Sequence, residues 1–95
     1  MHAVVREYSG VTELMDEMDA RHHEVEELMG GVPGFISYYA IRKGDALTTV
    51  TVCKDEAGTE ASSEVAAKWV ADNLPNLKSR APSIRSGEVF FNYSV

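Results

Sequence analysis

The chain has 95 residues, and acidic side chains outnumber basic ones enough to give a formal net charge of −6 at pH 7. A chain of this length has room for one small domain, so we expect residues 1–95 to fold as a single unit. The acidic balance argues against nucleic acids and anionic membranes as partners, because both require a basic surface. The first residues carry no signal-peptide pattern and no segment approaches a membrane span, so we expect a cytoplasmic protein.

The composition also limits how so small a domain is stabilised. A chain of this size buries only about 60–65% of the surface that its unfolded form exposes, so the core is thin. Cys53 is the only cysteine, and no disulfide can form within the chain. No spacing of Cys and His residues resembles a structural zinc site, so we expect no metal. Association with a second copy is the remaining means of stabilisation.

The first half of the chain begins with a strand and a helix. Residues 3–8 (AVVREY) are mostly β-formers and predict a strand that ends at Ser9-Gly10. From Val11 onward, apolar residues recur every three or four positions, which is the period of an amphipathic helix. Gly30-Gly31 is placed to end this helix, and Pro33 prevents its resumption. Its apolar stripe comprises Val11, Leu14, Met15, Met18, Val25, Leu28 and Met29.

A hairpin, a second helix and a last strand follow. Residues 34–42 and 46–54 are rich in β-formers and flank the turn sequence KGD, which predicts an antiparallel pair. Residues 55–63 predict a loop in which Thr59 or a following serine caps the helix. Pro75 ends the helix, residues 76–87 are a polar connector, and residues 88–95 predict the fourth strand. The face of the second helix comprises Ala61, Val65, Ala66, Trp69, Val70, Asn73 and Leu74.

This order predicts an α+β, ferredoxin-like β-α-β-β-α-β domain with a four-stranded antiparallel sheet. In the strand over residues 34–42, alternation puts Phe35, Tyr39 and Ile41 on one face. The opposite face then carries Ile36, Tyr38 and Ala40, so both faces of the sheet are apolar. A single layer of helices covers only one of them. We therefore expect a homodimer in which two sheets pack face to face as a dimeric α/β barrel.

The segment over residues 31–75, GVPGFISYYAIRKGDALTTVTVCKDEAGTEASSEVAAKWVADNLP, resembles the antibiotic-biosynthesis-monooxygenase-like branch of the dimeric α/β barrel superfamily. The matching features are Pro33-Gly34-Phe35 at the start of the second strand, the hairpin, and the second helix carrying Trp69. The likeness extends over nearly the whole chain. Its motifs are structural, so it indicates the fold more specifically than the reaction.

The resemblance implies a small pocket in each subunit between the helices and the sheet. Some proteins of this branch oxygenate polyaromatics or quinols without metal or flavin, others degrade haem, and many have no known activity. The haem-degrading members use an Asn on the first strand, a Trp on the second helix and a His after it. Here only Trp69 matches, because the first strand offers Arg6 and Glu7 and no His follows residue 23. The pattern therefore argues against haem degradation, and we expect no cofactor.

His22 is the candidate catalytic residue. It interrupts the apolar stripe, three residues after Asp19 and four before Glu26, and such spacings share one helix face. A neighbouring carboxylate favours imidazolium while burial opposes it, and this balance suits general acid–base chemistry near neutral pH. In the alternative interpretation His22 sits at the edge of the stripe, packed on one side and hydrated on the other. His23 lies a helical step of about 100° further round, which predicts a solvated position.

The candidate substrate-binding residues are Trp69, Tyr38, Tyr39 and Arg42. In the simpler interpretation, Trp69 packs in the core between the second helix and the sheet. In the other, it forms part of the pocket wall. The two roles are compatible. Tyr38 and Tyr39 point to opposite faces of their strand, so one faces the pocket and the other the dimer interface. Arg42 and Arg6 are candidates for orienting an anionic substrate, although arginines at strand ends are more often solvated.

These patterns lead to two hypotheses. In the first, the homodimer is a cofactor-independent monooxygenase for a small aromatic or quinoid substrate. His22 removes a proton from a phenol, and the resulting electron-rich anion reacts with oxygen. In the second, the chain is a non-catalytic dimer that binds a small ligand, or a structural barrel whose pocket is filled by its own side chains. Polar groups that converge on an apolar pocket would favour the first hypothesis.

Overall fold

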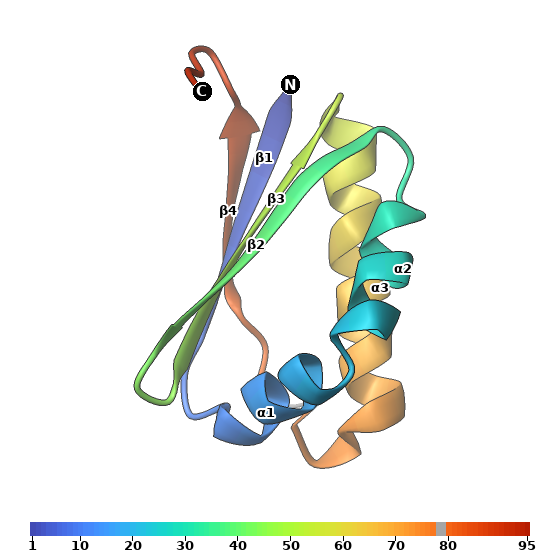
Figure 1. Ribbon diagram of the computed structural model, residues 1–95, viewed down its shortest axis with the longest axis vertical. Helices are drawn as coiled ribbons and strands as arrows, with labels where there is room; N and C mark the ends of the chain where they lie inside the picture. Colours follow the sequence, from blue (N-terminus) through green and yellow to red (C-terminus); the bar gives the residue numbers. More distant parts are fainter. Residues whose placement is uncertain (78–79) are drawn as a thin grey trace.

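The computed structural model describes residues 1–77 and 80–95 as one sheet with helices packed on one of its faces (Figure 1). The sheet is antiparallel with strand order β2-β3-β1-β4, and its strands are β1 (His2–Tyr8), β2 (Phe35–Lys43), β3 (Ala46–Cys53) and β4 (Ser83–Glu88). The helices are α1 (Thr12–Ala20), α2 (His22–Gly30) and α3 (Glu56–Asn73), followed by the 3₁₀ turn η1 (Pro75–Leu77). This arrangement confirms the ferredoxin-like α+β prediction. Among the described residues, no helix is long and apolar enough to cross a membrane.

The predicted helix over residues 11–29 is in fact two helices that meet at Arg21. The backbone of Arg21 has φ −120° and ψ 36°, outside the helical region, and its carbonyl accepts the N–H of Val25 at 3.2 Å. The apolar stripe nevertheless continues across the break, with Leu14 and Met15 of α1 and Val25 and Met29 of α2 all buried. The period of the sequence therefore located the buried face correctly, and the break changes only the direction of the chain.

The prediction that Thr59 or a following serine caps the second helix was wrong. Helix α3 begins at Glu56, and Asp55 is its N-cap. The backbone of Asp55 is extended, and its carboxylate accepts the N–H of Gly58 at 3.2 Å, which satisfies one of the free donors of the first turn. The longer helix carries two polar residues, Thr59 and Ser62, into the interior beside the sheet.

The prediction of a strand over residues 88–95 was also wrong. Strand β4 is the polar segment Ser83–Glu88, and its register with β1 ends at the pair of His2 and Glu88. Beyond that pair, the carbonyl of Met1 accepts the N–H of Val89 at 2.9 Å. The tail after Val89 has strong β-formers but pairs with no strand among the described residues, and strand formation depends on pairing more than on propensity. The predicted connector, residues 76–87, includes residues 78 and 79, which lie outside the described residues.

The register of the sheet defines a helix-covered face and an outer face. Arg6 pairs with Thr49, and both lie on the helix-covered face, whereas Tyr39 pairs with Val50 on the outer face. A register shift between Phe35 and Ser37 interrupts the alternation of β2. The prediction that Phe35 shares a face with Tyr39 was therefore wrong, because the irregularity places Phe35 on the helix-covered side, where it packs against the core.

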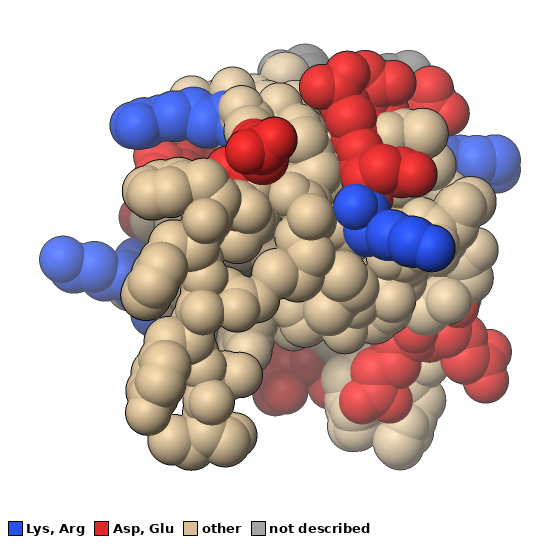
Figure 2. Space-filling model, turned by 90° about the horizontal axis from the view of Figure 1, so that it is seen from above, with Lys and Arg blue, Asp and Glu red and all other residues tan. Residues whose placement is uncertain are grey.

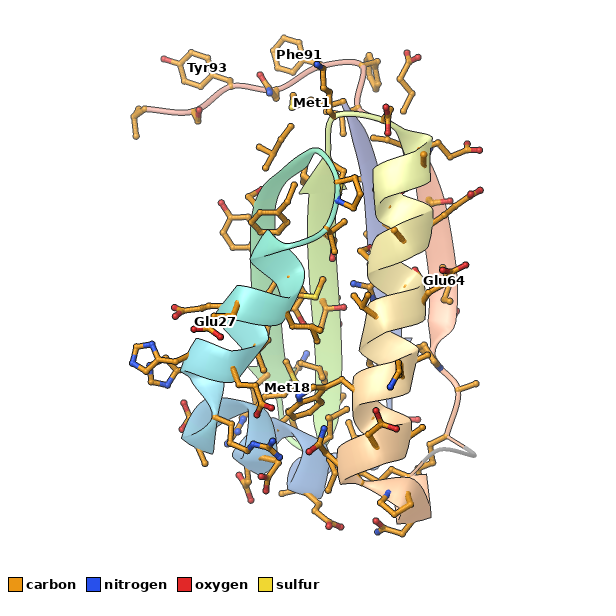
Figure 3. The ribbon with its side chains drawn as sticks, turned by 90° about the vertical axis from the view of Figure 1, so that its right-hand side faces the viewer. Met1, Met18, Glu27, Glu64, Phe91 and Tyr93 are labelled. Carbon is orange, nitrogen blue, oxygen red and sulfur yellow. The ribbon has the colours of Figure 1, made fainter. Side chains whose placement is uncertain are left out.

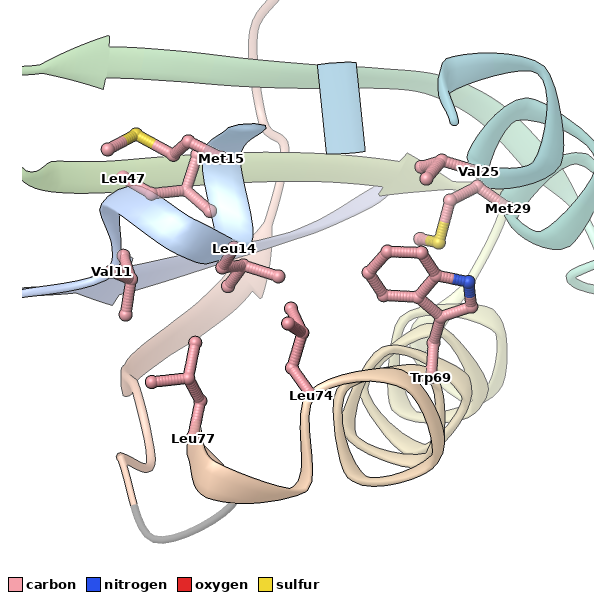
Figure 4. Packing of buried hydrophobic residues seen from close by; sticks show 9 residues of the cluster. All are labelled: Val11, Leu14, Met15, Val25, Met29, Leu47, Trp69, Leu74 and Leu77. Atoms are coloured by element: carbon pink, nitrogen blue, oxygen red, sulfur yellow. The ribbon is translucent and has the colours of Figure 1, made fainter. Parts of the chain in front are cut away.

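The core lies between the three helices and the helix-covered face (Figure 4). Trp69 projects from α3 toward Val25 and Met29 of α2, and Leu74 and Leu77 close the end of the core below α1. The buried cluster comprises Val11, Leu14, Met15, Val25, Met29, Leu47, Trp69, Leu74 and Leu77. The predicted inward face of the second helix is thus partly correct, since it contains Trp69 and Leu74.

Candidate functional site

An open cleft separates α1 and α2 from strand β2. It has a volume of about 650 Å³ and lies at the edge of the sheet that β2 forms. Its floor and walls are largely apolar, formed by Met15, Met18, Val25, Met29, Phe35 and Leu47. Polar side chains contribute to its lining from α1, α2 and β2, namely Asp19, His22, Glu26, Ser37, Tyr38 and Arg42. This is the combination of apolar walls and a few polar groups that small-molecule sites use.

A much smaller cavity of about 30 Å³ continues the cleft toward α3. The two spaces share Met18, Val25, Met29, Tyr38 and Leu47 in their walls. Thr49, Tyr8 and Trp69 line only the inner cavity. Its volume suffices for a water molecule or one small substituent, but not for a ring. In Figure 3 the side chain of Met18 reaches into the space between α2 and α3.

The structure places His22 at the mouth of the cleft, where its side chain is exposed. Its Nδ1 lies 3.1 Å from the main-chain carbonyl of Asp19, so Nδ1 carries the hydrogen and donates it. The Nε2 atom is then the free acceptor in the neutral ring. The carboxylate of Glu26 contacts Nδ1 of His23 at 3.1 Å, not His22. Glu26 therefore contacts the other histidine, and Asp19 reaches His22 through its main-chain carbonyl. His23 is exposed, as its helical position predicted.

The two tyrosines of β2 separate as the alternation predicted. Tyr38 lies on the helix-covered face and lines both the cleft and the inner cavity, whereas Tyr39 is 61% exposed on the outer face. Burial raises the pKa of Tyr38 to about 12, although the positive charge of Arg6 acts in the opposite direction. Tyr38 is therefore a neutral hydroxyl at neutral pH, able to donate a hydrogen bond to a ligand.

Trp69 is buried in the core and also forms one wall of the inner cavity, so both interpretations of this residue hold. Its Nε1–H has no acceptor among residues 1–77 and 80–95. An unsatisfied buried donor of this kind costs about 1–3 kcal/mol. The guanidinium of Arg21 lies 5.3 Å from the centre of the indole ring and also donates to Asn73 of α3 at 2.8 Å. These contacts fix the ring while leaving its N–H free.

Arg42 lines the cleft on the β2 side and is half exposed. Its guanidinium lies 3.5 Å from the carboxylate of Asp16 on α1. The ion pair spans the gap between the helix layer and the sheet. At this exposure such a pair contributes at most about 1 kcal/mol, so an anionic ligand can displace it at small cost. Arg42, His22 and Tyr38 thus share one cleft, while Trp69 lies deeper and Tyr39 faces away.

Arg6 is the residue that the sequence reasoning misjudged. It lies in the middle of β1 with a side chain only 2% exposed, rather than solvated at a strand end. Four hydroxyl groups accept hydrogen bonds from its guanidinium, those of Thr49 at 3.3 Å, Thr51 at 2.6 Å, Ser62 at 3.3 Å and Ser63 at 2.8 Å. The alternation of Val4, Arg6 and Tyr8 on one face of a strand was the signal that could have located it.

The arrangement combines two kinds of chemistry. At the mouth, His22 can accept a proton and Arg42 can attract an anion. At the inner end, Tyr38 offers a hydrogen-bond donor in a largely apolar space that Trp69 also lines. No cluster of three or more His, Cys, Asp or Glu side chains suited to a metal ion occurs in the part of the chain that the structure describes. The predicted catalytic role of His22 and the binding roles of Trp69, Tyr38, Tyr39 and Arg42 remain predictions.

Comparison with known proteins places the fold among solved structures. No protein-family model matches the chain, and no curated protein matches it in sequence. A protein of unknown function from Nitrosomonas europaea, NE2512, superposes with a TM-score of 0.74 at 18% identity, over 99% of this chain and 93% of that one. The heme-degrader MhuD from Mycobacterium tuberculosis, solved with two hemes bound in its active site, gives 0.67 at 14% identity, over 99% and 100%.

SnoaB from Streptomyces nogalater, a cofactor-independent oxygenase solved as a point mutant, gives a TM-score of 0.59 at 13% identity, over 99% of this chain and 95% of that one. At these identities the likeness concerns the fold. It confirms the structural resemblance expected from Pro33-Gly34-Phe35, the hairpin and the second helix. The chain has a ferredoxin-like fold, similar to those of structures described as antibiotic biosynthesis monooxygenases, a cofactor-independent oxygenase and a heme degrader.

Proposed function

We propose that the chain is a cofactor-independent monooxygenase acting on a small aromatic or quinoid substrate held in the cleft between the helices and β2. The observation that carries this proposal is the largely apolar cleft, to whose lining His22, Tyr38 and Arg42 contribute polar groups. Apolar walls with a few polar groups are what small-molecule sites use. Trp69 lines the inner cavity, and its buried Nε1–H has no acceptor among the described residues. The fold shared with a cofactor-independent oxygenase supports the same reaction class by analogy.

The reaction that fits this cleft needs no added reductant. A phenol loses its proton, and the electron-rich carbon para to the oxygen forms a bond to one atom of dioxygen. The resulting hydroperoxide loses water, which leaves a carbonyl at that carbon and gives a quinone. The substrate supplies all four electrons, one oxygen atom enters the product and the other leaves as water.

Four residues of the cleft and the inner cavity have roles in this proposal. His22 accepts the proton through Nε2, because Nδ1–H is bound to the carbonyl of Asp19. Tyr38 and Trp69 donate hydrogen bonds to the oxygen of the ring, and Arg42 orients a charged substituent at the mouth. Tyr39 is on the outer face, and its role in this proposal is at the interface between two subunits.

Oxygen uptake with a panel of naphthols and hydroquinones tests the proposal. We expect uptake by the wild type, a loss of about 10²-fold in kcat for His22→Ala, and no change for the matched control His23→Ala. Equal rates for both histidine variants would remove His22 from the mechanism. No uptake with any compound of the panel, together with intact binding, would favour the second function below.

The alternative function is a non-catalytic small-ligand-binding protein. The observation that favours it is the chemistry of the inner cavity, whose described lining contains no Asp, Glu, His, Lys or Arg. A group that transfers protons would then have to act from the mouth, some distance from a deeply seated oxygen. Saturable binding of an aromatic compound without oxygen consumption would be the expected outcome.

We also propose that two copies associate through their outer faces. Tyr39 and Ile41 are 61% and 52% exposed there, and the tail exposes Phe90, Phe91 and Tyr93. Figure 3 shows Phe91 and Tyr93 extending away from both layers, and Figure 2 shows a broad uncharged surface at the end where the termini lie. Large exposed apolar surfaces mark association sites. Light scattering should give twice the 10.4 kDa of one chain, and a clean monomer would contradict the proposal.

A further inference from the structure

Arg6 is a buried cation that has no anionic partner. Its side chain is 2% exposed, and all four of its hydrogen bonds go to neutral hydroxyl groups of β3 and α3. Among the described residues no carboxylate lies within 4 Å of its guanidinium. Four bonds also leave one of the five N–H groups without an acceptor in this set. The positive charge is hydrogen-bonded but not neutralised.

An uncompensated buried charge is unusual because it is expensive. Removing a guanidinium from water costs several kcal/mol, which hydroxyl dipoles offset only in part. Tyr8, Tyr38 and Cys53 are the other ionisable groups that respond to this charge, and burial raises the pKa of all three, so none supplies a negative charge at neutral pH. If the hydroxyl cluster served only to tie α3 to the sheet, a neutral side chain would do so at lower cost.

The position of Arg6 relates its charge to the cleft. Thr49, which accepts the Nε–H of Arg6, also lines the inner cavity. Tyr8 and Tyr38, two of the side chains whose pKa burial raises and the charge of Arg6 partly lowers, line the same cavity. The inner cavity is therefore bordered on one side by the hydroxyl shell of a buried cation. The hydroxyl groups and the positive charge behind them favour a negatively charged oxygen.

From this geometry we infer that the inner cavity receives an anionic oxygen substituent, a phenolate or a carboxylate, of an aromatic ligand whose ring lies in the outer cleft. The inference rests on the proposed function in assuming an aromatic ligand in that cleft. The inner cavity, at about 30 Å³, admits the substituent but excludes the ring, and the outer cleft, at about 650 Å³, admits the ring. Arg6 acts here as a binding residue through its charge, with Thr49 between it and the ligand.

Binding of a charged probe and its neutral counterpart tests the inference with the full chain in its native assembly. The probes are 2-naphthoate and 2-naphthamide, which share a ring and differ in charge, and an acidic nitronaphthol whose phenolate absorbs visible light. We expect the carboxylate or the phenolate to bind at least about tenfold more tightly than the amide. Whichever anionic probe binds more tightly than the amide, the carboxylate or the phenolate, identifies the kind of anionic oxygen that the cavity binds. Equal affinities for all three probes, or no binding of any, would overturn the inference.

Two variants assign the preference to Arg6. Arg6→Gln keeps hydrogen-bonding capacity without charge and should bring the affinity ratio close to one, whereas Arg6→Lys should retain part of it. Arg85→Gln is the matched control, because Arg85 is exposed and pairs with Val5 on the outer face, and it should leave the ratio unchanged. A preference that survives Arg6→Gln or disappears in Arg85→Gln contradicts the inference. If Arg6→Gln does not fold, Arg42→Gln decides between the two arginines, because a preference lost entirely in that variant would come from the mouth and contradict the inference.

The oxygen-uptake assay separates this inference from the proposed function. Charge-selective binding that depends on Arg6, without oxygen consumption, would contradict the oxygenase but support the anion site. Oxygen consumption on substrates bound without charge preference would support the oxygenase but contradict the anion site.

Discussion

The helix-covered face of the sheet buries an arginine and two threonines, whereas its outer face exposes a tyrosine and an isoleucine. Arg6, Thr49 and Thr51 are each at most 2% exposed, while Tyr39 and Ile41 are more than half exposed. This is the reverse of the usual partition between interior and surface. Each face therefore suggests a partner outside the single chain, a small anionic ligand for the first and a second sheet for the second. Substitutions on the two faces should accordingly have different kinds of effect.

Trp69 should give the largest effect on the helix-covered side. Trp69→Ala removes the ring at the centre of the core and should lower the free energy of unfolding by about 3–5 kcal/mol. Trp69→Phe keeps most of the packing and removes the unsatisfied N–H, so it should cost less than about 1.5 kcal/mol while weakening ligand binding. Urea denaturation of the wild type, Trp69→Ala and Trp69→Phe measures the loss in the free energy of unfolding for each variant. A large loss of stability in Trp69→Phe would mean that the N–H has a partner in the folded protein.

Gly58 tests how closely α3 sits on the sheet. A Cβ at this position would lie 2.8 Å from Cβ of Cys53 and would also meet the carbonyl oxygen of Pro33. Gly58→Ala should therefore destabilise the chain by about 1–3 kcal/mol, despite the better helix propensity of alanine. Gly30→Ala, where no atom lies within 4 Å, is the matched control and should be neutral or slightly stabilising. Equal melting temperatures for both variants would contradict the close contact.

Because of Tyr38, the free energy of unfolding should decrease at alkaline pH. Burial raises its pKa to about 12 in the folded chain, from 10.0 for an unperturbed tyrosine. The unfolded state therefore loses its proton first, so this contribution is complete below pH 10 and is lost as the pH rises toward 12. We expect a loss of about 1–2 kcal/mol that Tyr38→Phe does not show. Parallel denaturation curves for the two proteins between pH 9 and 11.5 would argue that Tyr38 is solvated.

Ile41 should have the smallest effect on the stability of one chain and a clear effect on association. Ile41→Glu places a charge on the outer face and should convert the dimer to a monomer, with a change of less than about 0.5 kcal/mol in the isolated subunit. Ile84 has nearly the same exposure but pairs with Arg6 on the helix-covered side of the edge strand β4. Ile84→Glu should leave the molecular mass unchanged. A dimer that persists in Ile41→Glu would place the interface elsewhere.

Local patterns in the sequence predicted much of the fold. The three- and four-residue recurrence from Val11 to Met29 identified the buried helix face, because that face must cover apolar surface whichever way the helices turn. The hairpin around Gly44 followed from its turn chemistry, and Gly44 has φ 61°, which favours glycine. Alternation along β2 separated Tyr38 from Tyr39, but the register shift after Phe35 was not visible in it.

Features that depend on contacts between residues far apart in the sequence were visible only in the tertiary structure. The tail after Val89 has the composition of a strand, yet the polar segment Ser83–Glu88 is the one that pairs with β1. Arg6 is a charged residue that sequence alone would place in water. Four hydroxyls from β3 and α3, 43 to 57 residues away, make its burial possible. A hydrogen-bonded shell of this kind exists only after the helix has packed on the sheet.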